Sequence, residues 1–274
     1  MNLFKQTGKQ MSLQSWQNEN PNILAGFTTR TGGFSTDSFQ TLNMGFHVED
    51  NPEKVQKNRL AFAEDIGFPI QNWVGTQQVH GTNIMKVTPQ DIGKGSLDFE
   101  SAIENTDGIY TEVENVLLTS LYADCVPLYF YSPENNLIGL AHAGWRGTVG
   151  KIGPKMVKLW CEKERVDIQD IKAAIGPAIG DCCYEVDEKV ITEVRAAMGG
   201  REDNNVFSKN QSGKYQLNLQ NLNEIFLINA GLSPENITKS HDCTSCKNDI
   251  FFSYRKENGK TGRMMSFIGR KHLV

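Results

Sequence analysis

Short apolar runs rich in β-branched and aromatic residues alternate with polar stretches along the chain. The runs at 116–122, 126–131 and 137–142 are bounded by Asp, Pro, Asn or Gly, a pattern typical of strands separated by turns. Similar runs at 23–29 and 171–175 predict two further strands. The segment before the C-terminus, 250–269, predicts a hairpin with its turn at 257–262.

Other segments repeat apolar residues at helical spacing. Asn51 suits an N-cap, Pro52 suits the first helical position, and Gly67 can end the helix that they begin. The predicted apolar stripe of this helix consists of Val55, Leu60, Phe62 and Ile66. Further helices are predicted at 148–162, 187–198 and 219–230.

Strands with interspersed helices predict a mixed-sheet α/β or α+β fold in which helices cover the sheet. No internal repeat, low-complexity stretch or linker divides the sequence. We therefore expect residues 1–274 to form a single domain.

Composition and charge argue against nucleic acid and membranes as partners. The chain has 274 residues and a net charge of −4, and its Lys and Arg residues are scattered, so we expect no nucleic-acid partner. No apolar run approaches the roughly 20 residues that span a bilayer, so we expect no membrane association. The N-terminal segment lacks the apolar stretch of a secretion signal, and a cytoplasmic location is expected. Composition leaves the oligomeric state undetermined.

The six cysteines are expected to be reduced thiols rather than disulfides. Cys182 and Cys183 are adjacent, a poor arrangement for a bridge, and are assigned a structural role. Cys243 and Cys246 form a CxxC pair, which can be redox-active or half of a zinc site. Because a lone CxxC is a weak signal, we leave the role of this pair open.

Three separate segments each place a reactive side chain beside small or rigid residues. His80 lies in QVHG (78–81), Cys125 in ADCVP (123–127) and His142 in AHAGWRG (141–147). Alone, His80 resembles a surface histidine and Cys125 a small core residue. Together, two imidazoles and one thiolate suit zinc, with the fourth tetrahedral position open to water or substrate.

Other residues near these segments are candidates for binding. Asp124 is a carboxylate beside an apolar run and needs a partner. Arg146 precedes a predicted helix, where backbone N–H groups and a guanidinium favour an anion, although it can also pair with an acidic neighbour. The stretch 175–186 predicts a second binding loop in which Tyr184 and Glu185 face a ligand.

Taken together, these motifs resemble the YfiH-like laccase-domain family, once called multicopper polyphenol oxidases and later described as purine nucleoside phosphorylases. The segments that carry the resemblance are TRTGGFS (29–35), LNMG (42–45), NPEKVQKNR (51–59), QVHG, TDGIYT (106–111), ADCVPLYF (123–130), AHAGWRG, IGPAIG with CYEV (175–186) and FFSYRKENGKTGR (251–263). ADCVP followed closely by HAGWRG is the most specific of them. One departure is Lys256, where the family usually has a second arginine.

The resemblance implies an α/β sandwich distantly like a bacterial deamidating toxin domain, and one catalytic zinc ion on His80, Cys125 and His142. It also implies phosphorolysis of adenosine, inosine, guanosine and methylthioadenosine with inorganic phosphate, together with hydrolytic deamination of adenosine.

From this we form a hypothesis about individual roles. Asp124 transfers protons during deamination, by analogy with the carboxylate of zinc deaminases. Arg146 holds phosphate, and Arg255 is a second choice. Ser35 and Asn43 contact the nucleoside.

Three alternatives remain at this point. A metal-free cysteine hydrolase would use Cys125 as nucleophile and His142 as base. A copper-dependent polyphenol oxidase would use the same ligand types, but five histidines, two of them His241 and His272, are too few for a multicopper cluster. A non-catalytic binding module would hold zinc structurally.

Overall fold

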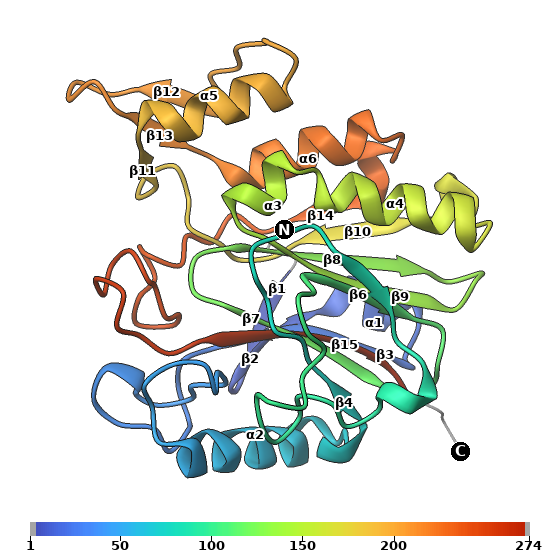
Figure 1. The fold of residues 1–274 in the computed structure, drawn as a ribbon. Coiled ribbons are helices and arrows are strands. Elements are labelled where there is room, and N and C mark those ends of the chain that lie inside the picture. Colours follow the sequence, from blue (N-terminus) through green and yellow to red (C-terminus); the bar gives the residue numbers. More distant parts are fainter. Residues whose placement is uncertain (1–3, 272–274) are drawn as a thin grey trace.

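The computed structural model describes residues 4–271 and contains two six-stranded mixed sheets stacked face to face (Figure 1). The first sheet has the order β1-β2-β3-β15-β7-β4 and the second the order β14-β10-β8-β9-β6-β5. The strands of the first sheet are β1 (Phe4–Thr7), β2 (Gln10–Leu13), β3 (Ile23–Thr28), β4 (Trp73–Val74), β7 (Leu117–Tyr122) and β15 (Met264–Arg270). Those of the second are β5 (Ile84–Lys86), β6 (Gly108–Thr111), β8 (Val126–Ser132), β9 (Leu137–Ala143), β10 (Lys172–Ile175) and β14 (Ile237–Lys239).

Helices cover the outer faces of both sheets. In Figure 1, α3, α4 and α6 lie along the second sheet, and α2 lies along the first. A small third sheet packs with α5 at one end of the molecule. The helices are α1 (Gln14–Glu19), α2 (Pro52–Ile66), α3 (Trp145–Val149), α4 (Ile152–Lys163), α5 (Glu188–Ala197) and α6 (Leu219–Asn229). The third sheet contains β11 (Glu185–Val186), β13 (Tyr215–Leu217) and β12 (Phe207–Lys209).

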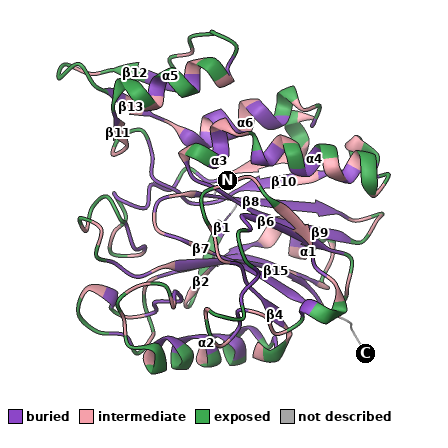
Figure 2. Cartoon of the chain, in the orientation of Figure 1, coloured by how far each residue is buried: buried purple, intermediate pink, exposed green. Residues whose placement is uncertain are grey.

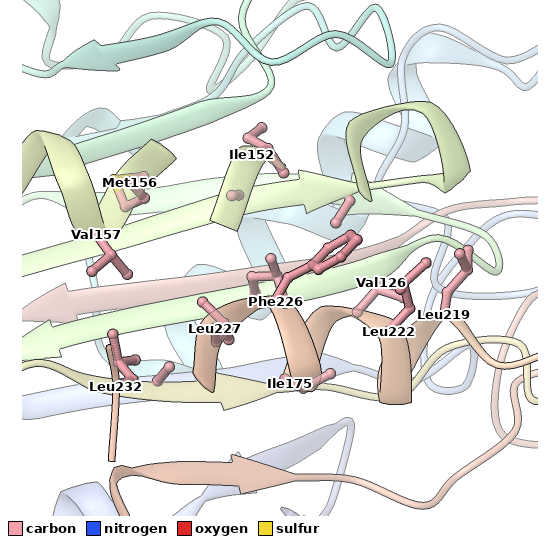
Figure 3. Close-up of a cluster of buried hydrophobic side chains, with 14 of the residues drawn as sticks. Val126, Ile152, Met156, Val157, Ile175, Leu219, Leu222, Phe226, Leu227 and Leu232 are labelled. Carbon is pink, nitrogen blue, oxygen red and sulfur yellow. The ribbon is translucent and has the colours of Figure 1, made fainter. Parts of the chain in front are cut away.

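Three apolar clusters hold these layers together. One lies between the two sheets, where Phe27 and Tyr122 face Tyr129 across the gap. A second lies between the second sheet and its helices, with Met156 and Phe226 among its buried members (Figure 3). The third lies under α2. Because burying one large apolar side chain contributes about 1.5–3 kcal/mol, these layers are the main source of stability.

The burial pattern follows this layering. Figure 2 shows the strands of both sheets largely buried, whereas the outward faces of the helices are exposed. All seven residues of β8, of β9 and of β15 are buried, as expected for central strands covered on both faces.

The structure confirms most of the predicted elements. β3, β7, β8, β9 and β10 match the five predicted strands, and the mixed-sheet α/β sandwich with flanking helices is confirmed. The ends of α2 are also as predicted: the Asn51 side chain accepts the N–H of Glu53 at 2.8 Å, and Gly67 ends the helix with φ +57°.

Two details of the helix predictions are wrong. Leu60 is 42% exposed, and the buried stripe of α2 instead includes Asn58 and Arg59, whose polar groups are satisfied by hydrogen bonds. The helix predicted at 148–162 is two helices, since the chain bends at Gly150 and Lys151, the latter with φ +60°.

The predicted C-terminal hairpin is also wrong. Only its second half forms a strand, β15, while the segment before it forms turns. Both edges of β15 are paired with distant strands, namely β3 and β7. No edge of β15 is therefore left to pair with the preceding segment.

Candidate active site

A cavity of about 590 Å³ opens at one end of the stacked sheets. Its walls come from the turn between β7 and β8, from the end of β9 with α3, and from loops at 176–184 and 251–263. Its volume lies in the range of small-molecule sites. In Figure 1, the loops before α2 (blue) and before β15 (red) lie on the left side of the molecule.

The cavity brings together the three side chains that the sequence singled out. His80 is on a loop, Cys125 directly precedes β8, and His142 is in β9, next to β8. One ligand atom from each lies within 4.8 Å of the other two. Gly144 makes this approach possible, because a Cβ there would lie 3.0 Å from both the Cys125 Sγ and the His80 Cδ2.

Asp107 organises this group of ligands. Its Oδ1 lies 2.9 Å from the Nδ1 of His142, and its carboxylate accepts the backbone N–H groups of Val79, His80 and Gly81 at 3.2, 3.0 and 2.7 Å. A hydrogen bond at Nδ1 leaves the Nε2 of His142 to face the cavity, which is the usual arrangement of a metal-binding histidine.

Electrostatics favour an anionic thiol in this group. Burial opposes ionisation of the Cys125 thiol, but the imidazoles of His142 and His80 lower its pKa to about 6. Burial disfavours the charged form of His142, but Cys125 and Asp107 raise its pKa to about 9. The two shifts therefore both favour a thiolate beside an imidazolium.

Asp107 was not singled out from the sequence, although it lies in the quoted segment TDGIYT. A buried carboxylate directly before a strand was the available signal. Burial acts against its ionisation, but the hydrogen bonds from His142 and the backbone hold its pKa below the usual range.

Three arginines, Arg146, Arg255 and Arg263, line the same cavity. The Arg146 guanidinium stacks 4.5 Å from the centre of the Trp145 ring, and no described carboxylate lies within 4.0 Å of it. Arg263 was missed at the sequence level; its Nη1 donates to the backbone oxygens of Thr261 and Gly262. Three cationic groups in one cavity suit an anion with several oxygens.

Asp124 lines the cavity and has the partners that its burial requires. Its Oδ1 accepts the Thr244 hydroxyl and its Oδ2 the backbone N–H of Arg255, both at 2.7 Å. The Arg255 Nη1 donates to the backbone oxygen of Glu185, and its guanidinium lies 5.1 Å from the centre of the Tyr184 ring. Asp124 therefore holds the wall that carries Arg255.

Ser35 and Asn43 are buried outside the cavity wall. The Ser35 hydroxyl donates to Asp50, and the Asn43 side chain also donates to Asp50. The Asn43 Oδ1 accepts the backbone N–H of Arg263 at 2.8 Å, so Asn43 supports a cavity residue from behind. These positions do not support the expected contact with the nucleoside.

Two further residues of the wall were not anticipated. His47 faces the cavity, and burial and the nearby Arg263 lower its pKa to about 4, so it is neutral near pH 7. Tyr254 adds an aromatic side chain that is 55% exposed. His241 does not line the cavity, and His272 lies outside the described residues.

The structure also unites the two cysteine pairs that the sequence analysis kept apart. The sulfur atoms of Cys182, Cys183, Cys243 and Cys246 lie within 4.8 Å of one another, and this set could bind a metal. The assumption that the CxxC pair lacks a second pair was wrong, because the loops that follow β10 and β14 meet.

Between residues 4 and 271, no helix has both the length and the apolar character needed to cross a bilayer.

The chain is similar to known proteins over nearly its whole length. The family model described as "Multi-copper polyphenol oxidoreductase laccase" matches residues 24–271. Purine nucleoside phosphorylase YlmD of Bacillus subtilis is 45% identical over 270 residues, covering 97% of this chain and 96% of that protein. The crystal structure of YlmD from Geobacillus stearothermophilus has a TM-score of 0.95 at 42% identity, covering 99% of this chain and 100% of that one. The hypothetical protein YfiH of Bacillus licheniformis has a TM-score of 0.94 at 41% identity, with the same coverage.

Proposed function

Because the chain belongs to the family described as multi-copper polyphenol oxidoreductase laccase, in which several relatives are named purine nucleoside phosphorylases, we propose that it cleaves purine nucleosides with inorganic phosphate. The products are the free base and ribose-1-phosphate, or methylthioribose-1-phosphate when the substrate is methylthioadenosine. The observation that carries the proposal is one cavity containing both a His-Cys-His ligand set and three arginines. The substrates proposed are adenosine, inosine, guanosine and methylthioadenosine.

The ligand set fits one zinc ion. His80, Cys125 and His142 would hold it, and Asp107 orients His142 and the backbone at His80 for that purpose. When bound, zinc supplies a Lewis acid and a water of lowered pKa. The lowered pKa of the Cys125 thiol favours the anionic form that a metal needs.

The arginines are proposed to bind phosphate. Arg146 has no carboxylate partner among the described residues, so its guanidinium is available to phosphate oxygens. Arg263 and Arg255 lie on the loop before β15 and add charge to the same cavity. The apolar side chains of Phe99, Leu121 and Ile179 provide a surface for a purine ring.

Phenol oxidation, suggested by the family description, has weaker support. Of the described histidines, only His47, His80 and His142 line the cavity. A multicopper oxidase needs many more imidazole ligands than these. The structure does offer a two-His, one-Cys set, so copper at this single site remains the less favoured alternative.

Product analysis tests the proposal. Protein of known metal content is incubated with adenosine, with and without phosphate, and the products are identified by chromatography and mass spectrometry. We expect adenine and ribose-1-phosphate only with phosphate, and neither from a His80→Ala control.

If folded, zinc-loaded protein yields no purine product, the proposal fails and the cysteine hydrolase becomes the better explanation. That enzyme would retain its activity with a chelator and would lose it when iodoacetamide alkylates Cys125.

Deamination of adenosine is a second reaction that we propose for the cavity, because the Asp124 carboxylate lies in its wall beside Cys125. Asp124→Asn should abolish inosine formation while phosphorolysis and zinc content remain. Retained deamination would remove Asp124 from proton transfer. Loss of both reactions would indicate that Asp124 acts by holding the wall that carries Arg255, since Asn keeps one acceptor oxygen and must lose the bond from either Thr244 or the Arg255 N–H.

A further inference from the structure

Two loops meet beside the cavity because the strands that precede them are neighbours. β10 and β14 run parallel, with Ile175 opposite Lys239, so the chain leaves both strands on the same side. Two backbone hydrogen bonds then join the loops. The Ala178 N–H donates to the backbone oxygen of Asp242 at 3.3 Å, and the Thr244 N–H donates to the backbone oxygen of Ala178 at 3.0 Å.

Each loop contributes two thiols to one cluster. The Cys246 Sγ lies 3.4 Å from both the Cys182 Sγ and the Cys183 Sγ, and all four sulfur atoms lie within 4.8 Å of one another. Four sulfur atoms at Zn–S distances of about 2.3 Å in a tetrahedron are roughly 3.8 Å apart. The observed spacing is close to that value, and all four cysteines are free thiols.

The backbone around Cys243 is arranged for a thiolate. Its Sγ accepts the backbone N–H groups of Gly180 and Cys246, at 3.2 and 3.5 Å. N–H donors stabilise negative charge on sulfur, and the thiolate is the form that binds metal. A Cβ at Gly180 would lie 3.3 Å from the Cys182 Sγ, so the glycine allows the first loop to approach.

We propose that Cys182, Cys183, Cys243 and Cys246 bind a structural Zn²⁺ ion, separate from the cavity ligands. Four thiolates fill a tetrahedral shell and leave no position for substrate, as is typical of a structural rather than a catalytic site. Soft thiolate ligands select zinc over Mg²⁺ or Ca²⁺. The site does not depend on the proposed phosphorolysis.

The ion would fasten one wall of the cavity. The first loop carries Ile179 and Tyr184, which line the cavity. The second carries Thr244, whose hydroxyl bonds to Asp124, the residue that holds the backbone of Arg255. Joining the two loops therefore keeps the Tyr184 ring beside the Arg255 guanidinium.

Metal analysis of variants tests this proposal. Cys182 and Cys246 are exposed, so the double variant Cys182→Ser, Cys246→Ser removes two ligands with little effect on the core. We expect the purified double variant to contain about one zinc ion per chain less than the wild type, as measured by mass spectrometry of the metal. The matched control Cys161→Ser, at a half-buried thiol outside both clusters, should lose none.

A His80→Ala background separates this site from the catalytic one. In that background the cysteine cluster should still bind Co²⁺, with the sulfur-to-metal charge-transfer bands and visible absorption of a tetrahedral thiolate complex. The added double variant should abolish those bands. If the catalytic proposal alone is wrong, these spectra are unchanged.

Two results would overturn the inference. One is equal zinc content in the wild type and the double variant. The other is an intact mass, after anaerobic purification without reductant, that has lost two hydrogens through pairing among these cysteines. Either would show that the cluster is not a metal site.

Discussion

At the scale of single residues, Asp107 links two sides of the cavity. One carboxylate orients His142 through Nδ1 and fixes the loop of His80 through three backbone N–H groups. His80 itself has φ +59°, a conformation uncommon for a residue with a side chain. The same hydrogen bonds thus hold two candidate metal ligands and the turn on which one of them lies.

Replacing Asp107 with Asn should weaken zinc binding at the cavity by about 10- to 100-fold, because Asn keeps only one acceptor oxygen. Either the contacts with His142 and the His80 N–H or those with the Val79 and Gly81 N–H groups are then lost. Competition with a chromogenic chelator measures the affinity. Asp91→Asn is the matched control. Asp91 is a buried carboxylate that accepts the backbone N–H of Thr88 at the start of a 3-10 helix, and it lies outside the cavity wall. Unchanged affinity in the Asp107 variant would contradict this role.

Removing the charge of Arg146 tests phosphate binding. Arg146→Gln should raise the KM for phosphate at least tenfold and change the KM for nucleoside much less, since a lost hydrogen bond to a charged group costs about 1.5–3 kcal/mol. Arg201→Gln, outside the cavity, is the control. Steady-state kinetics with each substrate varied in turn provides both constants, and an effect confined to nucleoside would rule out the assignment.

At the scale of elements, features set by neighbouring residues could be predicted from the sequence, whereas contacts between distant segments could not. Caps and apolar runs identified α2 and strands β7, β8 and β9, because these depend on neighbouring residues. The strand pairing of β15 and the meeting of the two cysteine loops depend on residues far away in sequence. The three candidate metal ligands were singled out because each is a reactive side chain in a distinctive short motif. Asp107 and Arg263 also lie in quoted segments, but their roles depend on contacts with residues far away in sequence.

One ion-pair network connects the edge of the second sheet to the helix that covers it. The carboxylate of Glu164, at the C-terminal end of α4, accepts two hydrogen bonds of 2.8 Å. One comes from the Nζ of Lys86 in β5 and the other from the hydroxyl of Tyr110 in β6. Burial opposes ionisation of Glu164, but the bonds from Lys86 and Tyr110 hold its pKa below the ordinary value. A carboxyl whose pKa is lower in the folded than in the unfolded state stabilises the folded state at pH values above its unfolded-state pKa. This stabilisation is lost as the pH falls through the folded-state pKa.

Glu164→Gln should therefore lower the free energy of unfolding by about 1 kcal/mol at neutral pH. The difference from the wild type should shrink below about pH 4, where the carboxyl of the wild type becomes protonated. Urea unfolding of both proteins at several pH values measures this difference in the free energy of unfolding. Glu162→Gln, in the same helix and with a looser 3.7 Å contact to Lys158, should show almost no effect. A difference that is independent of pH would indicate packing rather than charge.

At the scale of the whole molecule, the residues of each candidate metal site come from segments distant in the chain. His80, Cys125 and His142 belong to three separate segments, and the four cysteines belong to two. Unfolding must scatter both sets, so a metal binds the folded state far more tightly than the unfolded one.

Zinc should therefore raise the unfolding temperature in a concentration-dependent way. A free concentration of 100 times the Kd corresponds to about 2.7 kcal/mol for one site. Calorimetry with zinc or with a chelator measures the shift, and His80→Ala should retain only the part due to the cysteine cluster. An unfolding temperature indifferent to zinc in the wild type would show that neither cluster binds it.

The central position of β15 has a consequence for synthesis. β3 and β7 emerge from the ribosome long before residues 264–270, yet they have no partner between them until that segment has left the exit tunnel. During this interval each presents an unpaired edge, the kind of surface that aggregates or recruits chaperones. Arg255 and Arg263 emerge in the same late stretch. The nascent chain therefore completes its first sheet and gains two of the three cavity arginines at the same late stage of translation.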